Sequence, residues 1–500
     1  MMSEPTSESI PETSEQELAE RGSNRSQRPQ SQAFREFVGA DWAPRTEPDV
    51  TREPVADHAA RRRDAISAAF AGERLVVPAG PLKVRSNDTD YRFRPHSAFA
   101  HLTGLGTDEE PDAVLVLHPE ETGHEAVLYF RPLAARDTEE FYADARYGEF
   151  WVGARPTLAE LETRTGLRCA HIDELPDAIA KDAGHVLLRV VPGSDTEVEA
   201  LVEKIRGTSA EEADAALAEA LSELRLIKDA WEVEQLRAAV AASAEGFADI
   251  VRSLPAAVAH PRGERVIEGV FGAKAREEGN GIGYDTIAAA GDHATTLHWI
   301  RNDGVVRAGE LVLVDAGVEV DSLYTADITR TLPVDGTFTD IQRTIYTAVL
   351  DAADAAFAVA RPGLKFRDLH TAALEVLAER LEQWGLLPVE AAVAITPQGQ
   401  QHRRWMPHGT SHHLGLDVHD CAQARREMYL DAELAPGMVF TIEPGLYFKA
   451  DDLAVPEAYR GIGVRIEDDV LVTADGVENL SAALPRRPED VEAWMASLAR

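Results

Sequence analysis

Five side chains of the types that bind divalent metals lie on or beside short apolar segments in the C-terminal half of the chain. Asp315 follows the apolar run 311–314, and Glu443 follows the run 439–442 and precedes a Pro-Gly turn. Both carboxylates are therefore expected at strand ends, where α/β proteins usually build their sites. The fold must bring these separated segments together. The full set is Asp315, Asp327, His412, Glu443 and Glu467.

Asp315 and Asp327 flank a probable hairpin turn around Asp321 and Ser322. An antiparallel hairpin would place the two carboxylates side by side, where they repel each other without a counter-ion. A lone Asp at a strand end is more often a turn or cap residue, so each position by itself is weak evidence. The joint pattern indicates a metal site.

Four carboxylates and one imidazole can hold two divalent cations a few ångström apart. Two such cations can share a water, lower its pKa and make it a nucleophile near neutral pH. The set therefore predicts a metal-dependent hydrolase.

A cluster of histidines accompanies these carboxylates. A lone histidine is more often structural than a ligand, but four of them lie between residues 408 and 420, with two aspartates. Only one needs to bind metal; the others can bind substrate, stabilise a tetrahedral intermediate or carry protons. The cluster consists of His408, His412, His413 and His419, with Asp417 and Asp420.

The composition argues against several other classes of protein. The formal net charge is −36, from 86 acidic and 50 basic residues, whereas binding to nucleic acid or an anionic membrane requires clustered Lys and Arg. No apolar run approaches the roughly 18–20 residues that span a bilayer, and the acidic, polar N-terminus does not resemble a signal peptide, so we expect a cytoplasmic protein. Cys169 and Cys421 show no metal or redox spacing and are expected to be buried thiols.

The chain is expected to divide into a tail and two α/β domains, because 500 residues exceed one ordinary domain. Residues 1–56 are polar and predicted to be disordered. Residues 57–225 alternate strand-length runs with helical stretches, and residues 226–492 mix strands with long Ala-rich helices. Four apolar side chains of the tail could dock on the folded body: Phe34, Phe37, Val38 and Trp42.

In the order Asp, Asp, His, Glu, Glu, these segments resemble the pita-bread metallopeptidases. This group includes methionine aminopeptidase, prolidase, aminopeptidase P and the metal-free creatinase. The resemblance covers about residues 57–490 and implies a creatinase-like N-terminal α/β domain followed by a pita-bread catalytic domain. The segments 85–91, 94–104 and 408–420 look most like aminopeptidase P.

The resemblance implies two divalent cations, most often manganese in this family, bound by the five residues above. Asp327 and Glu467 would bridge both cations. A metal-bridging hydroxide would attack the carbonyl carbon of the residue before proline, and Glu443 would act as general base and then as general acid.

The resemblance also assigns residues around the metals. Three histidines would bind substrate and stabilise the intermediate: His298, His408 and His419. Tyr284 and Arg465 would hold ligand carboxylates. Arg465 shares a strand face with Glu467 in the alternating segment 463–467. This pattern favours a contact between Arg465 and a ligand carboxylate independently of the resemblance.

The expected activity is that of an Xaa-Pro aminopeptidase, acting on peptides with proline at the second position. Two alternatives are a prolidase, which cleaves Xaa-Pro dipeptides, and a catalytically inactive pita-bread module that binds peptides. A metal-free creatinase-like enzyme is disfavoured, because four clustered carboxylates without a cation repel one another. Since relatives form dimers or tetramers, a homo-oligomer is expected. Asp88 lies in a region that could reach a neighbouring subunit, but a solvated loop residue is the favoured interpretation.

One spacing departs from the family pattern. Eleven residues, 316–326, separate Asp315 from Asp327, where relatives usually have ten. One extra residue in a hairpin reverses the facing of everything beyond it unless a turn or bulge absorbs it. We expect this absorption near residues 321–323; otherwise Asp321 would compete as a ligand.

Overall fold

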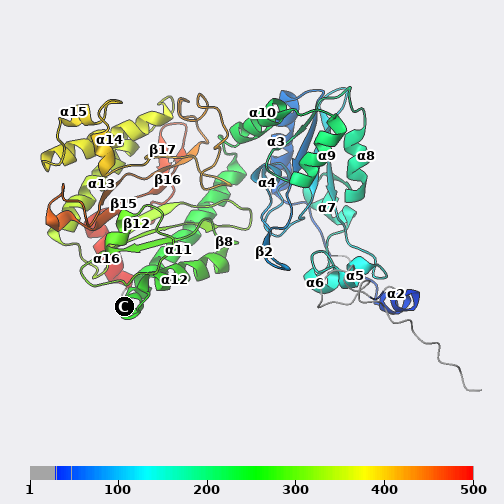
Figure 1. The fold of residues 1–500 in the computed structure, drawn as a ribbon, viewed down its shortest axis with the longest axis horizontal. Helices are drawn as coiled ribbons and strands as arrows, with labels where there is room; N and C mark the ends of the chain where they lie inside the picture. The colour runs from blue at the N-terminus through cyan, green and yellow to red at the C-terminus, as the bar shows by residue number, and fades with distance from the viewer. Residues whose placement is uncertain (1–28, 30, 47, 499–500) are drawn as a thin grey trace, which may run out of the picture.

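The computed structural model describes residues 29, 31–46 and 48–498, and these form two lobes (Figure 1). The N-terminal lobe carries the blue and cyan elements, and the C-terminal lobe carries the elements from green to red. The chain passes between them through α10 (Glu211–Leu224) and α11 (Ala230–Ala259). The disorder predicted for residues 1–28 and 30 lies outside the described residues. Among the described helices, none is both long and apolar enough to cross a bilayer.

Part of the predicted disordered tail is a helix, α2 (Gln32–Gly39). The rings of Phe34 and Trp42 pack edge-on against aromatic rings of α5 (Glu139–Ala143) at centroid distances of 5.1 and 5.7 Å. Phe37 is 80% exposed and does not dock. The expected docking is thus confirmed for two side chains of the cluster, and the prediction of disorder is wrong for this helix, because aromatic contacts order it.

The N-terminal lobe is built on one mixed five-stranded sheet. Odd and even positions of its strands feed two separate apolar clusters, one on each face, as the two-residue period of a strand requires. Helices α3 (Val55–Ala69) and α4 (Ser97–Thr103) cover one face with α10, while α8 (Leu175–Ala180) and α9 (Thr196–Arg206) cover the other. The strand order is β6 (Arg168–His171), β5 (His124–Phe130), β4 (Val114–Pro119), β1 (Arg74–Pro78), β7 (Leu188–Val190).

The C-terminal lobe places small antiparallel sheets between two helix pairs (Figure 1). One pair is α11 with α12 (Gly263–Glu278), and the other is α13 (Asp340–Val359) with α14 (Phe366–Gln383). The strands are β8 (Gly281–Ile282) with β11 (Val318–Glu319); β12 (Ile328–Pro333), β10 (Leu311–Ala316) and β9 (Ile287–Ala290); β13 (Val439–Ile442), β16 (Asp468–Val472) and β17 (Val477–Asn479); and β14 (Gly445–Phe448) with β15 (Ile462–Arg465).

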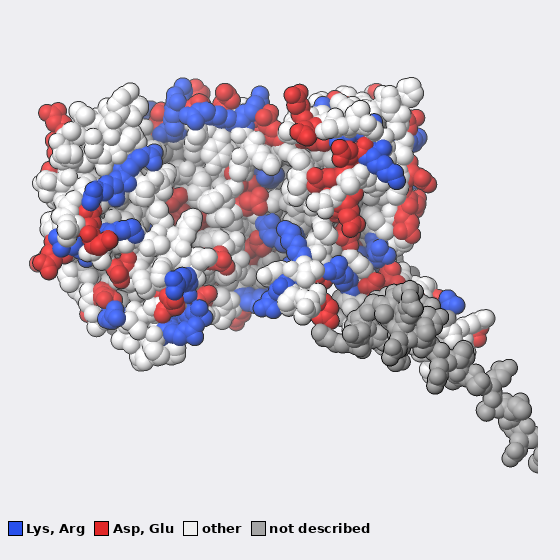
Figure 2. All heavy atoms as spheres, in the orientation of Figure 1, with Lys and Arg blue, Asp and Glu red and all other residues white. Residues whose placement is uncertain are grey.

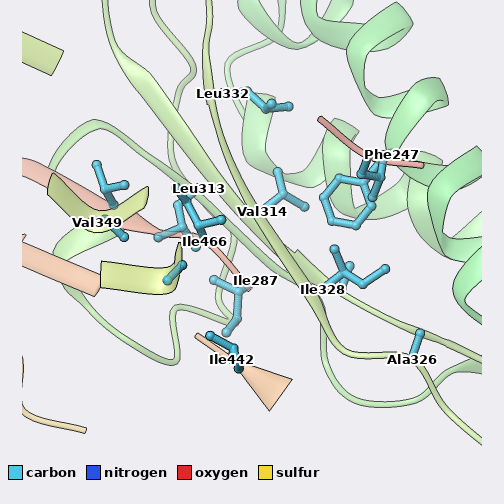
Figure 3. Close-up of a cluster of buried hydrophobic side chains, with 14 of the residues drawn as sticks. Phe247, Ile287, Leu313, Val314, Ala326, Ile328, Leu332, Val349, Ile442 and Ile466 are labelled. Atoms are coloured by element: carbon cyan, nitrogen blue, oxygen red, sulfur yellow. The ribbon is translucent and has the colours of Figure 1, made fainter. Parts of the chain in front are cut away.

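Side chains of the central strand β10 alternate between the two helix pairs. Leu313 lies toward Val349 of α13, while the next residue, Val314, lies toward Phe247 of α11 (Figure 3). All four side chains are buried. A strand buried on both faces reads as a continuous apolar run, which is how residues 311–314 appear in the sequence.

The hairpin between β10 and β12 absorbs its extra residue in the turn, as predicted. Asp315 pairs with Thr329, and the same register continues to the bridge between Glu319 and Thr325, so no bulge intervenes. The turn closes over residues 321–323, where Leu323 adopts a left-handed φ of 72°. Asp315 shares a face with Thr329, which lies directly opposite, and Asp327 lies two residues before Thr329 on the same face. This register therefore keeps Asp315 and Asp327 together.

The two lobes are joined by a buried ionic contact. Arg225 at the end of α10 and Lys228 in the linker contact opposite oxygens of Asp420, at 2.8 and 3.2 Å. Burial alone would raise the pKa of Asp420, but the two cations hold it below its usual range. The linker is thereby attached to the histidine-rich segment. The two cysteines are, as expected, buried free thiols.

Asp420→Asn is expected to destabilise the protein by about 3–5 kcal/mol, because it removes the ion pair of the buried Lys228 and leaves Arg225 with only Asp417, 3.7 Å away. The free energy of unfolding in urea measures the effect. Asp475→Asn, at an exposed position of the same lobe, is the matched control and should change stability by less than about 0.5 kcal/mol. A loss below about 1 kcal/mol for Asp420→Asn would contradict the assigned contact.

The candidate active site

One cavity of about 590 Å³ in the C-terminal lobe brings together all ten predicted site residues. Its wall also contains apolar side chains that the sequence did not single out, among them Leu297, Ile300 and Val418. The ten residues come from strand ends and loops that are far apart in the sequence: Tyr284, His298, Asp315, Asp327, His408, His412, His419, Glu443, Arg465 and Glu467.

The centre of the cavity is a tight group of acids around one imidazole. Nε2 of His412 lies 3.3 Å from Oδ2 of Asp327, 3.4 Å from Oε1 of Glu443 and 4.0 Å from Oε1 of Glu467. Ligand-type atoms of Asp327, His412 and Glu467 all lie within 4.8 Å of one another. This spacing suits coordination of a single ion by several side chains.

Asp315 lies at the side of this group, where two further side chains hold it. The Tyr284 hydroxyl is 2.7 Å from Oδ1 of Asp315 and 2.5 Å from Oδ1 of Asp327. The Arg465 guanidinium forms a short ion pair with Asp315, and its Nε donates to the Thr329 hydroxyl at 3.0 Å. That hydroxyl in turn donates to Glu467 at 2.7 Å. Thr329 thus links Arg465 to Glu467, a contact that the sequence analysis missed.

The pKa values in the cavity reflect buried negative charge. Burial raises the pKa of Glu443 to about 7, and it also raises the pKa of Asp327 and of Glu467, with their acidic neighbours adding to each shift. Burial alone would lower the pKa of His412, but Asp327 and Glu443 raise it to about 9. These three carboxylates, together with Asp315 beside them, form a donor set that fits divalent cations.

Tyr447 completes a chain of hydrogen bonds that sequence reasoning missed. Its oxygen accepts from Nη1 of Arg465 at 3.1 Å, so its proton is available to Nε2 of His408 at 2.8 Å. Burial, followed by the charge of Arg465, lowers the pKa of His408 to about 3, so this imidazole is neutral at pH 7. The strand period could have revealed Tyr447, which shares a face with Gly445, opposite Arg465.

The loop that carries His298 is held by a carboxylate outside the cavity. Glu264 on α12 is fully buried and accepts four N–H groups. They come from Trp299 at 2.9 Å, His293 at 2.7 Å, and the backbone of residues 290 and 304 at 2.9 and 2.6 Å. These donors lie on both sides of His298, so Glu264 closes the loop that presents it.

Glu264→Gln is expected to cost about 2–4 kcal/mol of stability, because the amide nitrogen of Gln faces donors and leaves N–H groups unpaired. Urea unfolding measures the loss. The Michaelis constant for a peptide substrate should also rise, since the loop with His298 forms the cavity wall. Glu268→Gln, one turn further along α12, is the matched control. Unchanged stability and an unchanged Michaelis constant would show that Glu264 does not hold the loop.

Comparisons with known proteins agree with this geometry. The family model of metallopeptidase family M24 matches residues 234–474, and the model of the aminopeptidase P N-terminal domain matches residues 58–187. Xaa-Pro aminopeptidase 1 of Streptomyces coelicolor is 52% identical, over 94% of this chain and 93% of its own length. The chain belongs to the aminopeptidase P family of M24 metallopeptidases.

Solved structures of the aminopeptidase P family also match. A variant of Escherichia coli aminopeptidase P in complex with substrate has a TM-score of 0.78 and 30% identity, and the match covers 89% of this chain and 99% of that chain. The same enzyme with the inhibitor Pro-Leu gives a TM-score of 0.77 at 31% identity, with the same coverage. The expected fold, an α/β N-terminal domain before a pita-bread domain, is confirmed. Family membership makes the chain a hydrolase and implies divalent metal binding.

Proposed function

We propose that this protein is an Xaa-Pro aminopeptidase, which hydrolyses the bond between an N-terminal residue and a following proline. The observation that carries the proposal is the convergence of four carboxylates and one imidazole in one cavity. Relatives that match 94% and 87% of this chain are named Xaa-Pro aminopeptidase 1 and Xaa-Pro aminopeptidase, which favours this activity over that of a prolidase. An inactive peptide-binding module would not need the complete donor set.

Two divalent cations per subunit, with manganese as the expected metal, would be held by the five side chains at the centre of the cavity. Asp327 and Glu467, at the middle of the group, are the proposed ligands of both. When bound, such cations lower the pKa of a shared water toward neutrality. The proposed ligands are Asp315, Asp327, His412, Glu443 and Glu467.

Glu443 is the proposed proton carrier. Its carboxylate, 3.4 Å from Nε2 of His412, would accept a proton from the attacking water and return it to the leaving proline nitrogen. Nδ1 of His408 lies 3.7 Å from Oε2 of Glu443, while its Nε2 contacts the Tyr447 hydroxyl. His408 is proposed to bind the substrate as a neutral imidazole. His298 and His419 are both exposed on the cavity wall and are proposed to contact the peptide. Tyr284 and Arg465 orient the acids without touching substrate.

The proposed partners are peptides with proline at the second position. The division into a tail (1–56), an N-terminal domain (57–225) and a catalytic domain (226–492) is also a proposal, whose second boundary falls at the end of α10. Homo-oligomerisation as a dimer or tetramer and a cytoplasmic location stay predictions from the sequence.

Turnover by metal-stripped protein reloaded with Mn²⁺ tests the proposal. An Xaa-Pro-Yaa tripeptide and an Xaa-Pro dipeptide are compared, and the same preparation without metal is the control. Metal-dependent release of the first residue from the tripeptide is expected. Preference for the dipeptide would make the protein a prolidase. No turnover of either peptide by protein that binds metal would overturn the proposal in favour of a binding module.

A further inference from the structure

A second cavity, of about 410 Å³, lies between the two lobes. The N-terminal lobe contributes Lys83, Arg94 and His96 to its wall, and the C-terminal lobe contributes Asp417 and His419. None of the activities described above uses this cavity.

The interdomain cavity adjoins the active-site cavity at His419. His419 lines both of them, and its ring centroid lies 4.5 Å from that of His412 at the centre of the acids. An extended peptide advances about 3.3 Å per residue. A substrate whose N-terminal residue lies at the acids and whose chain leaves past His419 would therefore enter the interdomain cavity within a few residues after proline.

Acidic and basic side chains are both spread over the face of the molecule that Figure 2 shows. The charges of the interdomain cavity are unusual for so acidic a protein, whose formal net charge is −36. The lining side chains include three cations but only one carboxylate, that of Asp417. Two of the cations are already paired: Arg94 with Glu319 at 2.9 Å, and Arg225 with the buried Asp420. Among the described residues, the third cation, Lys83, forms no ion pair and is exposed, so its charge is available to a ligand.

The cavity also offers a neutral hydrogen-bond donor. Burial, followed by the charge of Arg225, lowers the pKa of His96, so its imidazole is uncharged at pH 7. Its Nδ1 accepts from the backbone N–H of Ala98 at 3.2 Å, which places the ring proton on Nε2. The only carboxylate in the wall, Asp417, accepts from the Ser97 hydroxyl at 2.5 Å and lies 3.7 Å from both Arg94 and Arg225. These contacts offset its negative charge.

We propose that the interdomain cavity binds the C-terminal part of peptide substrates longer than three residues, and that Lys83 attracts their terminal carboxylate. The inference rests on the proposed aminopeptidase function and specifies its substrates. Lys83 would act on substrate binding alone, because it lies outside the cavity that holds the acids.

The test uses the full-length, metal-loaded protein and a series of Xaa-Pro-(Ala)n peptides, each made as a free acid and as a C-terminal amide. The ratio of kcat/KM for acid over amide is measured at each length. In the wild type this ratio should reach a maximum at one length above three residues, about two- to fivefold higher than for the tripeptide, as expected for an exposed ion pair. The maximum should weaken in high salt.

Lys83→Met should remove this maximum, whereas Lys204→Met, at an exposed position of α9, should retain it. A flat acid-to-amide ratio in the wild type, or a maximum that persists in Lys83→Met, would overturn the inference while leaving tripeptide turnover as evidence for the proposed function. Absence of tripeptide turnover in the wild type would overturn the proposed function and this inference together.

Discussion

Glu443→Gln is expected to lower kcat on the Xaa-Pro-Yaa tripeptide by about 10²- to 10⁴-fold, the range usual for the loss of a general acid–base group. Gln can still offer one oxygen to a cation, but it cannot take up or return a proton. Steady-state kinetics at saturating Mn²⁺ measures the effect.

The metal content of the Glu443→Gln variant must be measured beside its activity, because Glu443 is also a proposed ligand. The matched control is Glu457→Gln, an exposed position between β14 and β15. A loss of less than tenfold in a variant that keeps its metal would assign the proton transfer to another residue. A variant that loses metal would be compared with the wild type at equal occupancy.

The metal-free protein is expected to lose stability as the pH rises from about 5 to about 9. Burial raises the folded-state pKa of Glu443 to about 7 from 4.5, and Asp327 and Glu443 raise that of His412 to about 9 from 6.5 against the effect of burial. Over these intervals the folded state binds more protons than the unfolded state, so the free energy of unfolding falls with increasing pH. Each of the two groups contributes on the order of 3 kcal/mol to this loss.

Bound divalent cations should remove this slope, because they replace the protons with fixed positive charge. The rise in Tm produced by Mn²⁺ should therefore be larger at pH 8 than at pH 5.5. Thermal unfolding of chelator-treated and reloaded protein across this range measures both curves. If the Tm of the metal-free protein stayed level or rose between pH 5.5 and pH 8, the crowded carboxylates would not be the source of the instability.

The structure brings the ten predicted site residues to one cavity, and several of them lie in strongly marked local contexts. Asp315 ends an apolar strand, Glu443 precedes Pro-Gly, and the hairpin register that unites Asp315 with Asp327 depends on only a few turn residues. Local patterns of this kind can be recognised in the sequence without knowledge of the tertiary structure. The long helices and the apolar strands of both lobes were predictable for the same reason.

Residues that act at a distance in the sequence could not be found this way. Glu264 is an ordinary helical glutamate until the fold places four N–H groups around it. Thr329 bonds Arg465 and Glu467, which follow it in the chain by 136 and 138 residues, so no local pattern indicates this contact. The order in α2 was missed because a polar segment with three aromatic residues gives no sign of the surface on which it docks.

The contact of Arg225 and Lys228 with Asp420 crosses the domain boundary that the sequence indicates. By sequence, the catalytic unit begins at about residue 226, after α10. The histidine-rich segment of this unit is nevertheless stabilised by Arg225, which stands at the end of α10. A catalytic fragment that begins at residue 226 would lack Arg225. The buried Asp420 would then keep only one of its two cations, Lys228. Recombination between relatives, in evolution or in the laboratory, should therefore succeed more often when the crossover lies upstream of α10 than when it follows the apparent domain boundary.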